Sequence, residues 1–237
     1  MTQPLSTGQP PQLPPPRSQT WQDLLTQAER LFAERGIDGV SLRQVVSASG
    51  QRNPAAVQYH FGNKEGLIRA ILQQRVPVFN RRRTEMLDAL EANGQMGDVR
   101  QILAAVAVPL LELGPSAGYY VRFLARLTQD QELSSRLFNS LDESTSGGGR
   151  RVNEALHSAT SHLPDRIRDQ RIRMALNLVT GELARRATSA EAGHSTVPAD
   201  IFLDDLLDAA VGLLVAPVSR KPSVARRQAS RPPARGK

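Results

Sequence analysis

The sequence predicts an all-α protein in which a small N-terminal bundle precedes a larger helical domain. Apolar residues recur with a period of about 3.6 along most of the chain, and they do not alternate as they would in strands. Residues of the capping type stand where these apolar faces begin and end. The 237 residues are 40% hydrophobic, so the chain has room for one large domain or two small ones with buried cores.

The first two predicted helices are short and clearly bounded. The first begins near Thr20 and keeps an apolar face until it ends at Gly36, which suits the residue after a helix. Ser41 caps the second helix, and Gly50 ends it. A glycine turn therefore follows the second helix.

Two further helices follow this turn. Asn53 and Pro54 begin the third helix as cap and first residue, because proline lacks only an N–H that would be unpaired there. This helix runs to about Tyr59 and stops near Gly62. Asn63 then caps a fourth helix with an apolar face.

The remainder of the chain is predicted to form longer helices, with the glycine-rich stretch "STSGGGRR" as a loop at residues 144–151. The expected helices cover residues 99–113, 117–127, 133–141, 164–186 and 199–215. We expect this part to form a single helical domain.

Composition limits the function classes. The net charge is +7, but residues 218–237 carry seven bases and no acid, so residues 1–217 sum to zero (30 − 7 = 23 bases against 23 acids). The proline-rich arm, 1–17, and the basic tail, 218–237, are expected to be disordered.

The chain has no cysteine, which excludes disulfides and thiolate metal sites. No signal peptide or membrane span is evident, so a cytoplasmic location is expected.

Three short helices with a glycine turn between the second and third fit a helix-turn-helix, whose second helix enters the major groove of DNA. Gln58 could pair with adenine, while Tyr59, His60 and Lys64 are donors suited to phosphate oxygens. The candidate DNA-binding residues are Ser41, Arg43, Arg52, Asn53, Ala55, Gln58, Tyr59, His60 and Lys64.

The stretches "SLRQVVSASG" and "NPAAVQYHFGNKEGLI" resemble the TetR family of bacterial transcriptional regulators over about residues 20 to 72. The turn "GQRN" is one residue longer than is common in that family, and Pro54 stands where a small residue or glycine is usual. The resemblance implies a ligand-responsive DNA-binding regulator, most often a repressor, that binds a pseudo-palindromic operator as a homodimer. It also implies a protein that is not an enzyme and needs no cofactor or metal.

The resemblance further implies a helix-turn-helix domain at residues 18–75 and an effector-binding and dimerisation domain at 76–217. The last two helices are expected to form the dimer interface, since their apolar faces contain small residues. A small-molecule effector pocket is expected among Phe79, Met86, Leu110, Tyr120, Arg122, Phe123 and Phe138.

Several residues also have plainer interpretations. Phe61 is expected in the core beside Val57 and Leu67, and His60 could be an ordinary surface histidine. "NRRRT" at residues 80–84 is expected to be a solvated helix face, and the basic tail either attracts DNA or only aids solubility. Two other function classes remain open, namely an interaction module without specific DNA binding and a helical enzyme.

Overall fold

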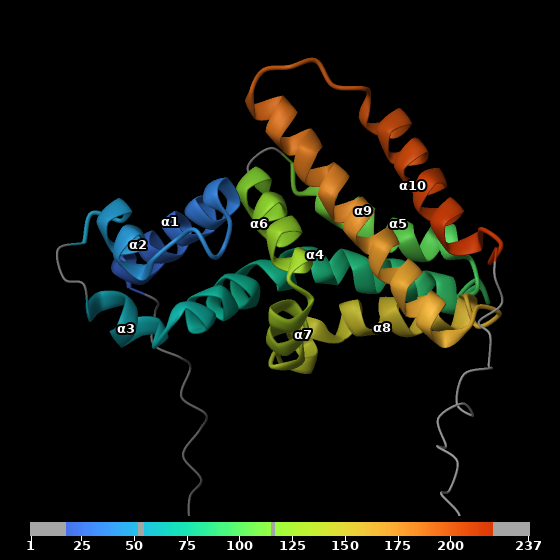
Figure 1. Ribbon diagram of the computed structural model, residues 1–237, viewed down its shortest axis with the longest axis horizontal. Helices are drawn as coiled ribbons and strands as arrows, with labels where there is room; N and C mark the ends of the chain where they lie inside the picture. Colours follow the sequence, from blue (N-terminus) through green and yellow to red (C-terminus); the bar gives the residue numbers. More distant parts are fainter. Residues whose placement is uncertain (1–17, 52–54, 115–116, 220–237) are drawn as a thin grey trace, which may run out of the picture.

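The computed structural model describes residues 18–51, 55–114 and 117–219, and these residues form ten helices without a strand (Figure 1). The predicted all-α class is therefore confirmed. The N-terminal arm and nearly all of the basic tail lie outside the described residues. In the part of the chain that is described, no helix combines the length and the apolar character that a membrane span requires.

The small N-terminal bundle contains α1 (Gln19–Arg35), α2 (Leu42–Ala48) and α3 (Ala55–Phe61). The cap of α1 is Ser18, two residues before the predicted Thr20, and its hydroxyl accepts a hydrogen bond from the Trp21 N–H at 3.2 Å. The inward faces carry fully buried side chains, including Leu24, Phe32, Val45 and Val57, and Leu67 of the following helix is also fully buried. These five side chains form the apolar centre of the bundle.

The long helix α4 (Lys64–Ala92) connects this bundle with the rest of the molecule. It is capped by Asn63, as predicted, and it continues through Pro77. The proposed domain boundary after residue 75 therefore lies inside a continuous helix. At that point Arg75 makes two hydrogen bonds, at 2.7 and 2.9 Å, to the buried carboxylate of Glu29 on α1. This ion pair joins α1 to α4.

The larger bundle contains six further helices, of which α5 and α8 pack against α4 (Figure 1). In Figure 1, α9 and α10 lie side by side as an antiparallel pair. The six helices are α5 (Val99–Glu112), α6 (Gly118–Gln129), α7 (Gln131–Asn139), α8 (Glu143–Ala159), α9 (Asp165–Glu191) and α10 (Ala199–Val215).

The predicted loop at 144–151 is wrong, because the stretch is the first half of α8. Asp142 caps this helix by accepting a hydrogen bond from the Thr145 N–H at 2.9 Å. Gly147 and Gly148 are buried in the packed helix. A methyl group on Gly148 would lie 2.2 Å from Oδ1 of Asn80 on α4. Glycine at this position therefore permits a close helix contact rather than a turn.

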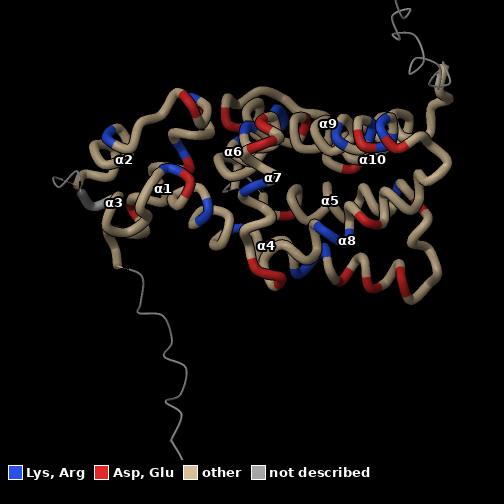
Figure 2. Tube along the Cα trace, turned by 60° about the horizontal axis from the view of Figure 1, so that its bottom comes forward, with Lys and Arg blue, Asp and Glu red and all other residues tan. Residues whose placement is uncertain are grey.

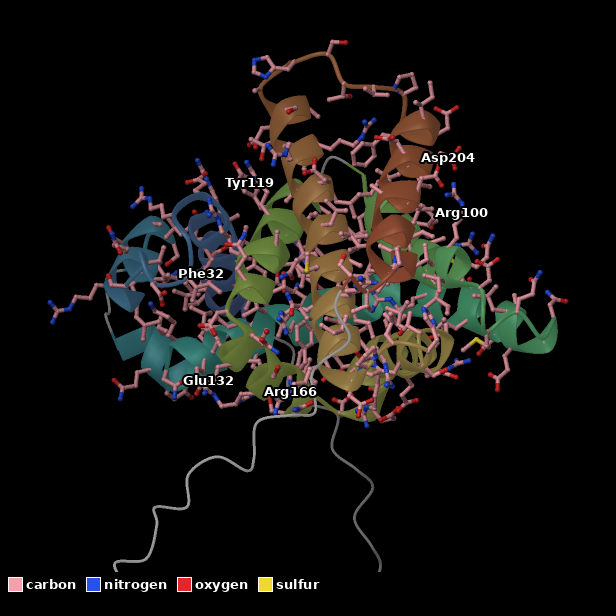
Figure 3. The ribbon with its side chains drawn as sticks, turned by 45° about the vertical axis from the view of Figure 1, so that its right-hand side comes forward. Phe32, Arg100, Tyr119, Glu132, Arg166 and Asp204 are labelled. Carbon is pink, nitrogen blue, oxygen red and sulfur yellow. The ribbon has the colours of Figure 1, made fainter. Side chains whose placement is uncertain are left out.

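The two bundles also meet where α1 packs against α6. The rings of Phe32 and Phe123 lie 6.1 Å apart across this junction, and both side chains are fully buried. Figure 3 shows Phe32 on α1 and Tyr119 at the start of α6 beside this junction. The DNA-binding candidate and the larger domain thus share an apolar core rather than a flexible hinge.

Candidate DNA interface and effector cavities

The exposed face of α3 presents the predicted contact residues. Val57 is fully buried, while Gln58 is exposed and Tyr59 is 86% exposed. The ring of His60 is half-buried and meets the ring of Tyr59 edge-on at 5.0 Å. A tyrosine that is so exposed adds almost nothing to the core, but its hydroxyl is free to donate to a phosphate oxygen.

Residues around the end of α3 hold it in place. Phe61 is only partly buried, and its ring lies 5.6 Å from that of Trp21 on α1. Gly62 has a φ of 75°, which a residue with a side chain rarely adopts. Asn63 then accepts a hydrogen bond from the Gly66 N–H at 2.8 Å. Phe61 therefore packs inward, as predicted, and its contact with Trp21 orients α3.

Lys64 and Ser41 already have structural partners. The ammonium of Lys64 donates to the backbone carbonyl of Ile37 at 2.9 Å, and so joins α4 to the segment between α1 and α2. The Ser41 hydroxyl accepts from the Gln44 N–H at 3.3 Å, and the Gln44 side chain accepts from the Ser41 N–H at 2.7 Å. This reciprocal capping box fixes the start of α2. The neighbouring Arg43 is exposed.

Three of the predicted contacts cannot be placed. Arg52 and Asn53 lie outside the described residues, as does Pro54, and the side chain of Ala55 is not described. Figure 2 shows basic and acidic residues interspersed over both bundles, in agreement with the zero net charge of residues 1–217. Attraction of DNA to the described part of the chain therefore depends on individual donors rather than on a broad basic field.

The predicted pocket residues do not surround a single cavity. Tyr120 and Phe123 are fully buried and Phe79 is 3% exposed; the Tyr120 ring lies 5.7 Å from Phe79 and 6.1 Å from Phe123. This aromatic cluster is part of the closed core. Met86 and Phe138 are partly buried and pack against the same core.

A buried arginine lies beside this aromatic cluster. Arg83 is 8% exposed, its guanidinium lies 4.9 Å from the Phe79 ring centre, and its Nε donates to the carbonyl of Ala105 at 3.3 Å. Burial lowers the pKa of Arg83 to about 10. The expected solvated face of "NRRRT" is therefore wrong for Arg83, because α8 covers that side of α4. Arg81 and Arg82 are exposed, as expected.

The cavities on the described part of the larger bundle include three that bear on an effector site. One of about 470 Å³ lies between α4 and α5 and is lined by Phe79. A groove of about 890 Å³ runs between α1, α6, α9 and α10. A cavity of about 460 Å³ lies between α5, α6 and α9 and is lined by Leu110 and Arg122. Arg122 also lines the groove, and is the only predicted pocket residue that borders two of these three cavities.

The polar contacts of Arg122 lie at the end of α9. One of its terminal nitrogens is 2.6 Å from the carboxylate of Glu191, and its guanidinium lies 4.6 Å from the centre of the Tyr119 ring. Its buried Nε has no hydrogen-bond partner among the described residues. On the other side, the guanidinium of Arg30 on α1 lies 5.8 Å from the same Tyr119 ring. Tyr119 therefore lies between an arginine of each bundle.

Comparison with known proteins decides the family of the small bundle. Residues 24–71 match the family model of bacterial regulatory proteins of the tetR family. The N-terminal domain of this chain is a member of that family. The chain is also similar to the HTH-type transcriptional repressor AcnR of Corynebacterium glutamicum, with 38% identity over 53 residues. That alignment covers 22% of this chain and 28% of AcnR, so it spans less than a third of either protein.

Most of the chain, taken together, is similar to a solved structure in fold alone. A crystal structure of the HlyIIR mutant protein, with residues 170-185 substituted by alanine, has a TM-score of 0.50 and 18% identity. The alignment covers 84% of this chain and 97% of that one. The sequence predicted the TetR-type domain and a pocket role for Arg122. It did not predict that Arg122 contacts Tyr119 and Glu191, or that Arg75 pairs with Glu29. The two ion pairs, Arg75 with Glu29 and Arg122 with Glu191, join residues 46 or more positions apart, and no local pattern reveals them.

Proposed function

We propose that this protein is a DNA-binding transcriptional regulator that represses by occupying a pseudo-palindromic operator as a homodimer and is released by a small-molecule effector. The observation that carries the proposal is the exposed face of α3 within a TetR-type domain, where Tyr59 and His60 stand on the solvent side of a helix anchored by Val57. In a helix-turn-helix this helix enters the major groove.

The contacts that fix the short helices favour a helix-turn-helix that is already ordered in the free protein. The capping box of α2, the Lys64 bond to Ile37 and the stacking of Phe61 on Trp21 each fix one helix of the bundle before DNA arrives. Ordering that is already present in the free protein does not have to be supplied by binding energy. We therefore assign Ser41 and Lys64 roles that include positioning, and Tyr59 and His60 the phosphate contacts.

A dimer through α9 and α10 fits the surface of the described chain. Met174 on α9 is 44% exposed, and Ile201 and Val215 on α10 are 57% and 54% exposed. A methyl group added to Gly181 or Gly212 would meet no atom within 4 Å, so both glycines face open space. Exposed apolar residues next to such glycines allow a second copy to approach closely.

The direct test is DNA binding by a variant with Tyr59→Ala and His60→Ala, measured by fluorescence anisotropy on the DNA upstream of the protein's own gene. We expect affinity to fall by roughly tenfold or more, because two phosphate contacts are lost. The urea midpoint should hardly change, because Tyr59 contributes little to the core. Lys64 is left intact, since its bond to Ile37 would confuse binding with folding.

The matched control is Val78→Ala, which removes an exposed side chain of α4 remote from α3. This control should bind DNA as the unaltered protein does. If the double variant also binds as well as the unaltered protein, α3 does not contact DNA. The chain would then be an interaction module that keeps the fold without specific DNA binding. Failure of the unaltered protein to bind at low salt would contradict the proposal as a whole.

A further inference from the structure

We infer that the effector is an amphipathic organic carboxylate that binds in the 460 Å³ cavity between α5, α6 and α9 and takes Arg122 away from Glu191. This inference rests on the proposed function, because it gives a chemical class to the effector of that regulator. It is drawn from the walls of the cavity, from the state of Arg122, and from the contacts that join Arg122 to α1.

The cavity has apolar walls and a charged end. Leu110 and Leu111 of α5, Val121 of α6 and Leu183 of α9 contribute apolar surface. The charged lining comprises Arg122, Arg186 and Glu191, which gives two cations against one carboxylate. Its volume lies within the range of small-molecule sites. A ligand with an apolar body and one negative charge matches both features.

Of the two cations, Arg122 is the one whose hydrogen bonding is incomplete. Arg186 donates to the carbonyl of Val197 at 2.6 Å and stacks on the ring of Phe202 at 4.8 Å. Arg122 is 15% exposed and is paired with Glu191 through one terminal nitrogen, while its buried Nε has no partner in the described chain. A carboxylate ligand can engage Nε and a terminal nitrogen together, which is the geometry that guanidinium groups favour.

Glu191 is a weak competitor for Arg122. Its side chain is 49% exposed, so water can solvate its carboxylate when the pair opens. It is also the last residue of α9, where the partial negative charge of the helix end disfavours an acid. Replacing a half-exposed carboxylate costs less than opening a pair in which both partners are buried. A ligand carboxylate can therefore replace Glu191 without a large loss elsewhere.

Replacement of Glu191 by the ligand carboxylate should change the contacts between α6 and α1 through Tyr119. This ring lies 4.6 Å from the guanidinium of Arg122 and 5.8 Å from that of Arg30, which is paired with Glu34 on α1 at 2.9 Å. When Arg122 turns toward the ligand, the stacking on Tyr119 changes and the contact with Arg30 changes with it. Trp21 of α1 packs against Phe61 of α3. The change at Tyr119 and Arg30 is therefore transmitted through α1 to α3, the helix proposed to enter the major groove.

The experiment measures binding of octanoate, octanamide and octylammonium to the full chain by calorimetry, first without DNA. We expect octanoate to bind at least tenfold more tightly than the neutral octanamide, and octylammonium to bind least. Arg122→Gln should abolish the preference for octanoate over octanamide. The matched control is Arg126→Gln, one turn along α6, which is exposed and does not line this cavity. This control should leave the preference unchanged.

Glu191→Gln separates a binding role for Arg122 from a merely structural one. Removing the competing carboxylate should tighten octanoate binding by roughly threefold to tenfold, whereas loss of a structural pair would leave binding unchanged or weaker. Equal affinity for octanoate and octanamide, an unchanged preference in Arg122→Gln, or no binding of octanoate at millimolar concentration would each overturn the inference.

Two measurements test whether octanoate binding is coupled to the DNA-binding domain. They are the fluorescence emission of Trp21, the single tryptophan of the chain, and the release of DNA. Octanoate should change Trp21 emission and lower DNA affinity. Arg30→Gln, which removes the α1 neighbour of Tyr119 outside the cavity, should suppress both effects while octanoate still binds. Octanoate that binds as expected but leaves Trp21 emission and DNA affinity unchanged would refute the coupling. If the chain binds octanoate in this way but never binds DNA, the proposed regulator fails while the carboxylate site stands.

Discussion

At the scale of single residues, Tyr120 is an unfavourable side chain at the centre of the fold. It is fully buried between Phe79 and Phe123, and its hydroxyl has no hydrogen-bond partner in the described part of the chain. Burial of a hydroxyl without a partner is costly. Burial also raises the pKa of Tyr120 well above its ordinary value. The ring stabilises the core, whereas the hydroxyl does not.

We therefore expect Tyr120→Phe to stabilise the protein by about 1 kcal/mol at neutral pH, measured by urea unfolding. The gain should grow above pH of about 10, because only the unfolded state of the original protein then ionises this tyrosine. Arg83 titrates in both proteins, so the difference between them reports Tyr120. Tyr59→Phe is the control and should change little, since its hydroxyl is in water. A loss of stability in Tyr120→Phe would show that the hydroxyl is bonded.

At the scale of elements, the glycines of α8 show how helix packing can override a local signal. Three successive glycines lower helix propensity and predict a loop, yet α8 forms through them. Gly148 allows α8 to approach the part of α4 that buries Asn80 and Arg83. Burial between the helices stabilises α8 more than its poor propensity destabilises it.

Gly148→Ala should destabilise the protein by about 1–3 kcal/mol, because the new methyl group would overlap the buried Asn80 amide. Gly149→Ala is the matched control, since its methyl group would be 3.7 Å from its nearest neighbour, Arg83. This control should be neutral or stabilising by about 0.5–1 kcal/mol. Adding Asn80→Ala should recover much of the loss in Gly148→Ala. Equal stability of the two glycine variants would contradict the close contact of α8 with α4.

At the scale of the whole molecule, α10 has one face packed against the bundle and one face exposed to solvent. Arg100 of α5 pairs with Asp204 at 2.7 Å and with Asp208, and Figure 3 shows Arg100 and Asp204 close together. Leu206, Leu207, Ala210 and Leu214 are buried against the bundle, while Ile201, Gly212 and Val215 face outward. The outward residues continue the proposed dimer surface.

Gly212→Arg should therefore leave the subunit folded and break the dimer, because a Cβ here would meet no atom of the described chain within 4 Å and the arginine would occupy the approach of the second copy. Light scattering should report a mass of 25.9 kDa for the variant and twice that for the original protein. Val78→Arg, at an exposed position on α4, is the control. A dimeric Gly212→Arg variant would place the interface elsewhere.

Local signals in the sequence determined the helices other than α8, and the TetR-type domain. Caps such as Ser41 and Asn63 and the 3.6-residue apolar period act over a few residues, so they can be read without the fold. The same holds for the outward position of Tyr59, which follows from the buried position of Val57 on one short helix.

Only the tertiary structure decided which distant residues meet. It buried Arg83 beneath α8, made the glycines of α8 a packing surface, and closed the core around Tyr120 instead of leaving it as a pocket. It also brought Arg122 to Glu191 and set Tyr119 between Arg122 and Arg30. These outcomes depend on free energies of packing between helices far apart in the chain, which no local pattern encodes.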